Sequence, residues 1–335
     1  MGEHLVEDGW NRQALERAGA LDADVLLVEQ RRTDAGVSQS RATLSFDGPR
    51  RGVASWLAAP APMGSLDYVS PQARLVCALA LKDPALAMDD LLHVLDAAGT
   101  EAREAIASLE DTAHLRIHDD LAAPLGGEIA IAIDGPVLPF PAWKAIVEVY
   151  DPARLQKAIE WIVQDCDARL RQNGEQGVVL EPAVPGSRTF YAIHARGETG
   201  GIYYVMQDGY AVVASSREVL DQALRIREAG HGIARSAKFR ALCPADGNTN
   251  FSAVVYQDMT PDLAPLLRRL APSIGGGFGA SPEALAHVIG HASLAYAYAE
   301  EDRITFAADD VAESFGLDLR SLLTEPPAAT NASTP

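Results

Sequence analysis

The sequence contains few cysteines, and none of them forms a recognisable pair. Cys77, Cys166 and Cys243 are the only three in 335 residues and show no CxxC spacing, so they give neither a disulfide framework nor a cysteine-rich zinc site. Cys77 falls in an apolar strand pattern and Cys166 on the apolar stripe of a helix pattern, which predicts that both are small core residues. Cys243 precedes Pro244 in a loop, where a half-buried, inert thiol is favoured over an exposed one.

Long apolar runs and positive charge are also lacking. No run of about 18 apolar residues occurs, so the sequence predicts no transmembrane helix. The first residues, MGEHLVEDGWNRQ, are polar and acidic and match no secretory leader. The 28 Lys and Arg residues are outnumbered by 46 Asp and Glu, for a net charge of −18. This balance disfavours nucleic acid and anionic membranes as partners, because both are densely negative.

Motifs of catalysis are missing as well. There is no GxSxG nucleophile elbow, and no serine lies in a recognisable nucleophile motif. The adjacent carboxylates Asp89-Asp90, Asp119-Asp120 and Asp309-Asp310 lie at expected helix starts or solvated edges, where acidic residues are common without a catalytic role. The sequence therefore assigns no catalytic, cofactor-binding or metal-binding residue, and it favours a protein that is not an enzyme.

One histidine pair supports an alternative in which the chain is a metal-dependent hydrolase. His114 and His118 are four residues apart and are followed by Asp119 and Asp120. On a helix this spacing places both imidazoles on one face, as metal ligands require, although a third ligand must come from elsewhere in the fold. Surface histidines beside a helix-capping Asp pair are the favoured interpretation.

Two further segments have weaker functional patterns. His287 and His291 repeat the four-residue spacing, but Val288 stands where a zinc protease has its glutamate. Gly275–Gly279, GGGFG, precedes an expected helix over residues 281–289 and could cradle a phosphate. It lacks a P-loop lysine, so a flexible connection between helices is favoured.

Turning to what is present, three strand–cap–proline–helix units recur along the chain. The central one, WKAIVEVYDPARLQKAIEWIVQDCDARLR (Trp143–Arg171), alternates as a strand and then takes helical spacing after Asp151-Pro152. Asp caps a helix, and Pro suits the first helical position. The same device occurs over Ala78–Leu95 and Val254–Leu270, which predicts an internal repeat of βαββ type.

The strongest hairpin signal is Asp208-Gly209 between two apolar runs, over residues 202–216. Ser215 with Glu218 predicts a capping box for the helix that follows, over residues 217–229. The hairpin carries Met206 and three tyrosines, Tyr203, Tyr204 and Tyr210. Packing of these side chains in the core is favoured, and an apolar ligand groove is the alternative.

Composition predicts the domain organisation. AAPAPMG, at residues 58–64, resembles a linker. We expect an N-terminal helix (8–18) and a β-meander in residues 1–62, with strands at 23–30, 38–46 and 51–57. We expect α+β modules over 63–180 and 181–325 and a disordered tail over 326–335. The meander looks like the end of a unit, which fits an N-terminally truncated piece.

Four segments together resemble a family. They are RGVASWLAAPAPMGSLDYVSP, DDLAAPLGGEIAIAIDGP, WKAIVEVYDPARLQKAIE and GYAVVASSREVLDQAL. They are similar to a bacterial family known only as a domain of unknown function, whose members look like exported or envelope proteins with repeated strand–Asp-Pro–helix units. The similarity covers roughly residues 51–309. It implies a periplasmic or secreted setting and carries over no catalytic residue.

Composition, patterning and resemblance lead to one expected fold and one leading function. We expect an α+β protein with mainly antiparallel, curved sheets, helices packed on one face and an internal βαββ-like repeat. The leading function is a non-enzymatic envelope or secreted protein that binds a lipid, peptide or protein in an apolar groove. A metal-dependent hydrolase and an assembly module with a large exposed apolar patch are the alternatives.

Overall fold

The computed structural model describes residues 22–32, 38–97, 104, 106–107, 110–111, 115–137, 140–183, 189–198, 200–244, 248–258 and 292–309. Several expectations lie outside these residues. They are the helix over 8–18, the helical half of the third repeat unit, the segment 275–289 and the tail.

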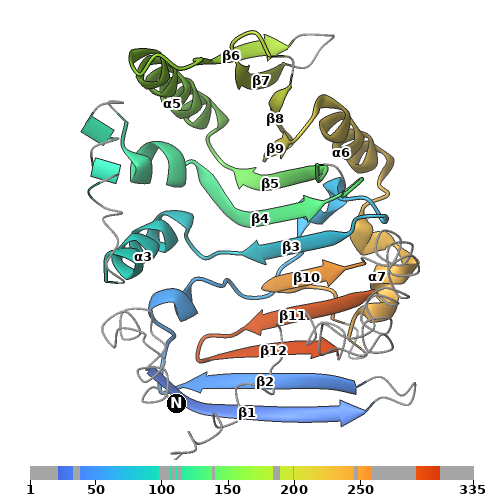
Figure 1. Ribbon diagram of the computed structural model, residues 1–335. Helices are drawn as coiled ribbons and strands as arrows, with labels where there is room; N and C mark the ends of the chain where they lie inside the picture. The colour runs from blue at the N-terminus through green and yellow to red at the C-terminus, as the bar shows by residue number, and fades with distance from the viewer. Residues whose placement is uncertain are drawn as a thin grey trace, which may run out of the picture.

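The described strands form a single antiparallel sheet of twelve strands (Figure 1). Its order is β1-β2-β12-β11-β10-β3-β4-β5-β9-β8-β7-β6. The strands are β1 (Ala23–Arg32), β2 (Ser38–Phe46), β3 (Leu75–Ala80), β4 (Leu125–Ile133), β5 (Trp143–Val149), β6 (Val178–Ala183), β7 (Phe190–Ala195), β8 (Gly201–Gln207), β9 (Tyr210–Ala214), β10 (Ala253–Gln257), β11 (Ser293–Ala299) and β12 (Arg303–Asp309).

The expected sheet-rich α+β class is confirmed, but the helices lie on both faces of the sheet and not on one. They are α3 (Pro84–Ala97), α5 (Pro152–Gln172), α6 (Arg217–Ala229) and α7 (Ala237–Leu242), with short turns η2 (Gly52–Ser55), η3 (Gly64–Tyr68), η4 (Ile117–Ala122) and η5 (Ile233–Arg235). Figure 1 shows α3 and α5 toward one end of the strands, with α6 and α7 toward the other.

Strand register identifies the two faces. Leu220 and Leu224 of α6 pack in one core with Ala130, Ile146 and Val212, so we call this side the α6 face. The residues between these, Ile131, Ala145 and Val213, pair with one another across β4, β5 and β9 and point to the opposite side, the α5 face. On that side, Leu155 and Ile159 of α5 pack against Ala211 and Met206.

The central strand–helix unit folds as its sequence predicts. The Asp151 carboxylate accepts a hydrogen bond from the Arg154 N–H at 3.0 Å, and Pro152 opens α5. Asp83 caps α3 in the same way, through the N–H groups of Ala85 and Leu86. In both units a short polar side chain ends the strand and satisfies free N–H groups at the helix start.

The cap of α6 differs from the prediction by one residue. Ser216, not Ser215, is the N-cap, and its hydroxyl accepts from the Val219 N–H at 3.3 Å. Ser215 instead receives a hydrogen bond from the Trp143 N–H through its hydroxyl, at 3.2 Å. The helix itself spans the predicted residues 217–229, and only the cap differs, because Ser215 continues the pairing of β9 with β5.

The prediction of a third strand in the meander, over residues 51–57, is wrong. This segment contains the 3-10 turn η2, and β2 pairs with β12 in its place. The buried Arg50 guanidinium donates to the carbonyls of Ala54, Leu57 (2.9 Å) and Glu300 (2.6 Å). These bonds curl the segment over the end of the sheet.

The prediction that Cys77 and Cys166 are core residues is also wrong. Cys77 is exposed because the α5 face is bare around it, and Cys166 lies on an exposed part of α5. Cys243 packs partly buried against the main core, as expected. The division of the chain at residues 62/63 and 180/181 stays a prediction.

A buried polar network on the α6 face holds the segment before β3 in place. Lys144 and Asp134 are almost fully buried, and the lysine Nζ lies 2.5 Å from the Asp134 Oδ2. Asp134 accepts from the Ser70 N–H at 2.7 Å, and Lys144 donates to the Tyr68 carbonyl at 2.7 Å. Each partner of this ion pair therefore also binds the backbone of residues 68–70.

Candidate functional site

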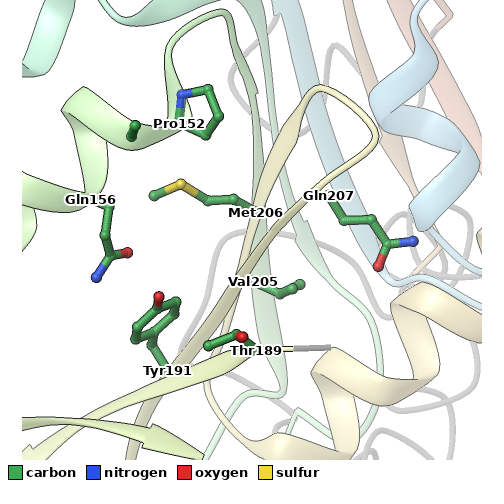
Figure 2. Close-up of a pocket in the computed structure, with 8 residues that line it drawn as sticks. Pro152, Gln156, Thr189, Tyr191, Val205, Met206 and Gln207 are labelled. Carbon is green, nitrogen blue, oxygen red and sulfur yellow. The ribbon is translucent and has the colours of Figure 1, made fainter. Parts of the chain in front are cut away.

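The candidate site is a groove on the α5 face, between α5 and strands β6, β7 and β8. It consists of two hollows of about 500 and 450 Å³, and Tyr191 borders both of them. Figure 2 shows the first hollow, with Gln156, Tyr191 and Met206 around one open space. We call the two hollows together the α5 groove.

The hairpin β8–β9 supplies the sheet side of the groove. Asp208 and Gly209 adopt left-handed conformations, with φ of 52° and 80°, and make the predicted tight turn. Register then places Tyr191 opposite Tyr204, and their rings stack with centroids 5.0 Å apart. Met206 lies beside them, so the floor of the groove is aromatic and apolar.

Polar side chains of α5 form the opposite wall. Tyr204 donates its hydroxyl hydrogen to Gln156 Oε1 at 3.0 Å, and Gln156 donates to Glu160 Oε1 at 2.9 Å. Burial raises the pKa of the Tyr204 hydroxyl, which therefore stays a donor at neutral pH. Gln164 continues this polar row along the second hollow.

The far end of the groove is closed by an ion pair between α5 and the end of β7. Arg196 donates two hydrogen bonds to Asp167, at 2.9 and 2.8 Å. The guanidinium lowers the pKa of the Asp167 carboxyl. This two-pronged geometry fixes the distance between helix and sheet at that end.

The predicted groove residues are only partly brought together. Met206 lines the hollow, and Tyr204 lies buried beneath it with 2% of its surface exposed. Tyr203 and Tyr210 alternate to the α6 face, where both pack against the core. Sequence reasoning missed Tyr191 and Gln156. No local sequence signal identifies them, because Tyr191 enters the groove only through its register opposite Tyr204.

The histidines considered as metal ligands do not lie at the α5 groove in the part of the chain that the structure describes. Among the described residues, no group of three or more His, Cys, Asp or Glu side chains is arranged to hold a metal ion. His118 lies on η4, about half exposed, with Asp89 Oδ2 at 3.5 Å and Asp119 Oδ1 at 3.0 Å. His114, His287, His291 and Gly275–Gly279 lie outside the described residues.

The environment of His118 gives a testable pH dependence. The hydrogen bond to Asp119, with the more distant Asp89, raises the pKa of His118 above its ordinary value of 6.5. The charged pair is therefore complete at low pH and is lost as pH rises through the raised pKa. We expect an NMR titration to show this raised value and Asp119→Asn to lower it. Asp89→Asn, the control, is expected to have a smaller effect. An unchanged pKa in Asp119→Asn would contradict the assignment.

Comparison of the chain with protein-family models, with curated proteins and with solved structures finds no match. In the part of the chain that the structure describes, no helix is both long and apolar enough to cross a bilayer.

Proposed function

We propose that the chain is a non-enzymatic binding protein and that the α5 groove holds an extended peptide segment of its ligand. The observation that carries this proposal is the pairing of an aromatic and apolar floor with a hydrogen-bonding wall along one helix. Ligand sites in proteins commonly combine an apolar lining with a few placed polar groups.

The spacing of the polar wall favours a peptide. Gln156, Glu160 and Gln164 are four residues apart on α5, so they repeat about every 6 Å along the helix axis. In an extended chain, backbone groups on one side repeat about every 6.6–6.8 Å, or two residues. A peptide lying along α5 can therefore pair its amides with the wall and direct alternate side chains to Tyr191 and Met206.

The composition of the groove disfavours a free lipid tail. A hydrocarbon chain beside Gln156 and Glu160 would bury their polar atoms without replacing the hydrogen bonds that water supplies, which costs free energy. The charged groups at the groove are Glu160 and the Arg196–Asp167 pair. Within a chain of net charge −18, this leaves a weakly acidic site suited to a neutral or basic peptide.

A matched pair of substitutions on α5 tests the proposal. Ala153 and Ala168 are both exposed on this helix, but only Ala153 lines the groove. After selection of binders from a library of unstructured decapeptides, we expect Ala153→Trp to weaken binding at least tenfold, or about 1.4 kcal/mol. Ala168→Trp is expected to leave it unchanged. Binding is measured by fluorescence anisotropy.

Two results would contradict the proposal. The first is equal binding by both variants, which would place the peptide site elsewhere. The second is the selection of no peptide together with tight binding of a fluorescent fatty acid that Ala153→Trp abolishes, which would make the groove a lipid site.

The proposal also includes an internal βαββ-like repeat and a location outside the cytoplasm. The internal repeat is supported by two equivalent junctions, the Asp-Pro caps that lead β3 into α3 and β5 into α5. A location outside the cytoplasm is supported by the family resemblance of residues 51–309 alone. Fractionation of host cells, with detection of the chain in the periplasm or medium, tests the location.

A further inference from the structure

The α5 face carries an apolar patch that none of the described helices covers. Ile131 and Phe306 keep 55% and 37% of their surface exposed. Phe306 also lines a hollow of about 180 Å³ between aliphatic and aromatic residues of β10, β11 and β12. We define the bare patch by the exposed residues Cys77, Ile131 and Phe306, together with half-buried Val255 and the buried Ala295 and Ala308 that form its floor. Apolar patches on a protein surface commonly mark a contact site.

Strand register makes the patch continuous across five strands. Ala295 pairs with Val255, Val255 with Cys77, and Cys77 with Ile131. Ala308 of β12 clusters with Ala295 and Val255 at the other end. With neighbouring strands about 4.8 Å apart, the patch spans about 19 Å from β12 to β4.

The chain itself continues from the edge of this patch. β12 ends at Asp309, one residue after Ala308, and 26 residues follow it. Residues 311–323, VAESFGLDLRSLL, place Val311, Phe315, Leu319 and Leu322 at spacings of four, four and three, with charged residues between them. On a helix these four positions would form one apolar stripe.

We propose that residues 311–323 dock across the bare patch as a helix, with the stripe facing the sheet. Thirteen helical residues span about 20 Å, which matches the distance from β12 to β4. On that path Leu319 lies about 12 Å from the start of the helix, close to β3 and Cys77. Direct tethering to β12 gives this segment an effective concentration of about millimolar, which favours it over a second copy of the chain.

Cys77 provides the probe, because it is exposed in the middle of the bare patch. In the full chain with Cys166→Ser and Cys243→Ala, we compare Leu319→Cys with its neighbour Asp318→Cys. Under mild oxidation we expect the cysteine introduced at 319 to form an intramolecular disulfide with Cys77 at least tenfold faster than the one at 318. The reason is that a disulfide needs Cβ atoms about 3.5–4.5 Å apart. Non-reducing gels and peptide mass spectrometry measure the rate and the pairing.

A second measurement does not depend on disulfide geometry. We expect N-ethylmaleimide to alkylate Cys77 at least tenfold faster in a chain ending at Asp309, and in full-length Phe315→Asp, than in the parent chain. The full-length variant keeps the comparison valid if the shortened chain does not fold. Equal cross-linking at 318 and 319, or equal alkylation in the parent and both variants, would overturn the proposal. Disulfide-linked dimers in place of the intramolecular product would show that a second copy covers the patch.

Discussion

Replacing Lys144 with methionine is expected to lower the free energy of unfolding by about 3–5 kcal/mol. The Lys144 side chain is fully buried, pairs with Asp134 at 2.5 Å and donates to the Tyr68 carbonyl. Without the ammonium, the Asp134 carboxylate stays buried with no opposite charge. Methionine keeps most of the side-chain volume, so the loss reports the charge and not a cavity.

A second substitution separates the charge effect from general damage. Burial lowers the pKa of Lys144, whereas the Asp134 carboxylate raises it, so each charge depends on the other. In Lys144→Met, the further change Asp134→Asn removes the unpaired charge and keeps an oxygen for the Ser70 N–H. We expect the double variant to recover part of the lost stability in urea unfolding. Additive losses would show that the two charges are not coupled.

Local structure could be predicted from the sequence wherever short-range chemistry decides it. The Asp151-Pro152 junction fixes where β5 ends and α5 begins, because cap and proline act on adjacent residues. Asp208-Gly209 does the same for the β8–β9 hairpin. Both signals hold regardless of what packs around them.

The pairing of distant strands could not be predicted in this way. β2 lies beside β12, more than 250 residues later, and an alternating pattern does not identify its partner. The same limit explains why Cys77 was wrongly predicted to be buried. The sequence of its strand is apolar on both faces, and this pattern does not show whether a helix covers the second face. Residues 52–57 curl because the Arg50 side chain donates to backbone carbonyls. The alternation of apolar and polar residues in this segment gives no sign of these bonds.

The groove shows the same division between local and distant signals. Met206 was recognised because its hairpin was recognised, whereas its neighbours in space come from α5 and β7. Tyr191 became a groove residue only through its register opposite Tyr204. A site assembled from three elements therefore needs the fold before its residues can be named.

The buried polar side chains and the candidate site lie on opposite faces of the sheet, and this separation can be used experimentally. The buried network of Asp134 and Lys144 and the separate Glu128 carboxylate lie on the α6 face, while the α5 groove and the bare patch lie on the other. Variants of the network are expected to change stability without changing the affinity of the folded protein for a peptide. Variants such as Ala153→Trp are expected to do the reverse.

The second large effect is expected at Glu128, where leucine should cost about 3 kcal/mol of stability. Its nearly buried carboxylate accepts hydrogen bonds from the Gly64 and Ser65 N–H groups, at 3.1 and 2.6 Å, and from the Tyr210 hydroxyl at 2.8 Å. Leucine leaves the buried Ser65 N–H and the two part-buried donors without this acceptor. Both N–H groups belong to the first residues of η3, so the loss loosens the segment that covers the α6 face.

Glutamine at the same position is the matched control, because its amide oxygen still accepts from one or two of these donors. We expect Glu128→Gln to lose less than half as much stability as Glu128→Leu in urea unfolding. Hydrogen exchange adds a local readout, since the Gly64 and Ser65 amides should exchange faster in Glu128→Leu even where the rest of the sheet stays protected. Equal losses in both variants, with unchanged exchange at these amides, would show that the carboxylate does not hold η3.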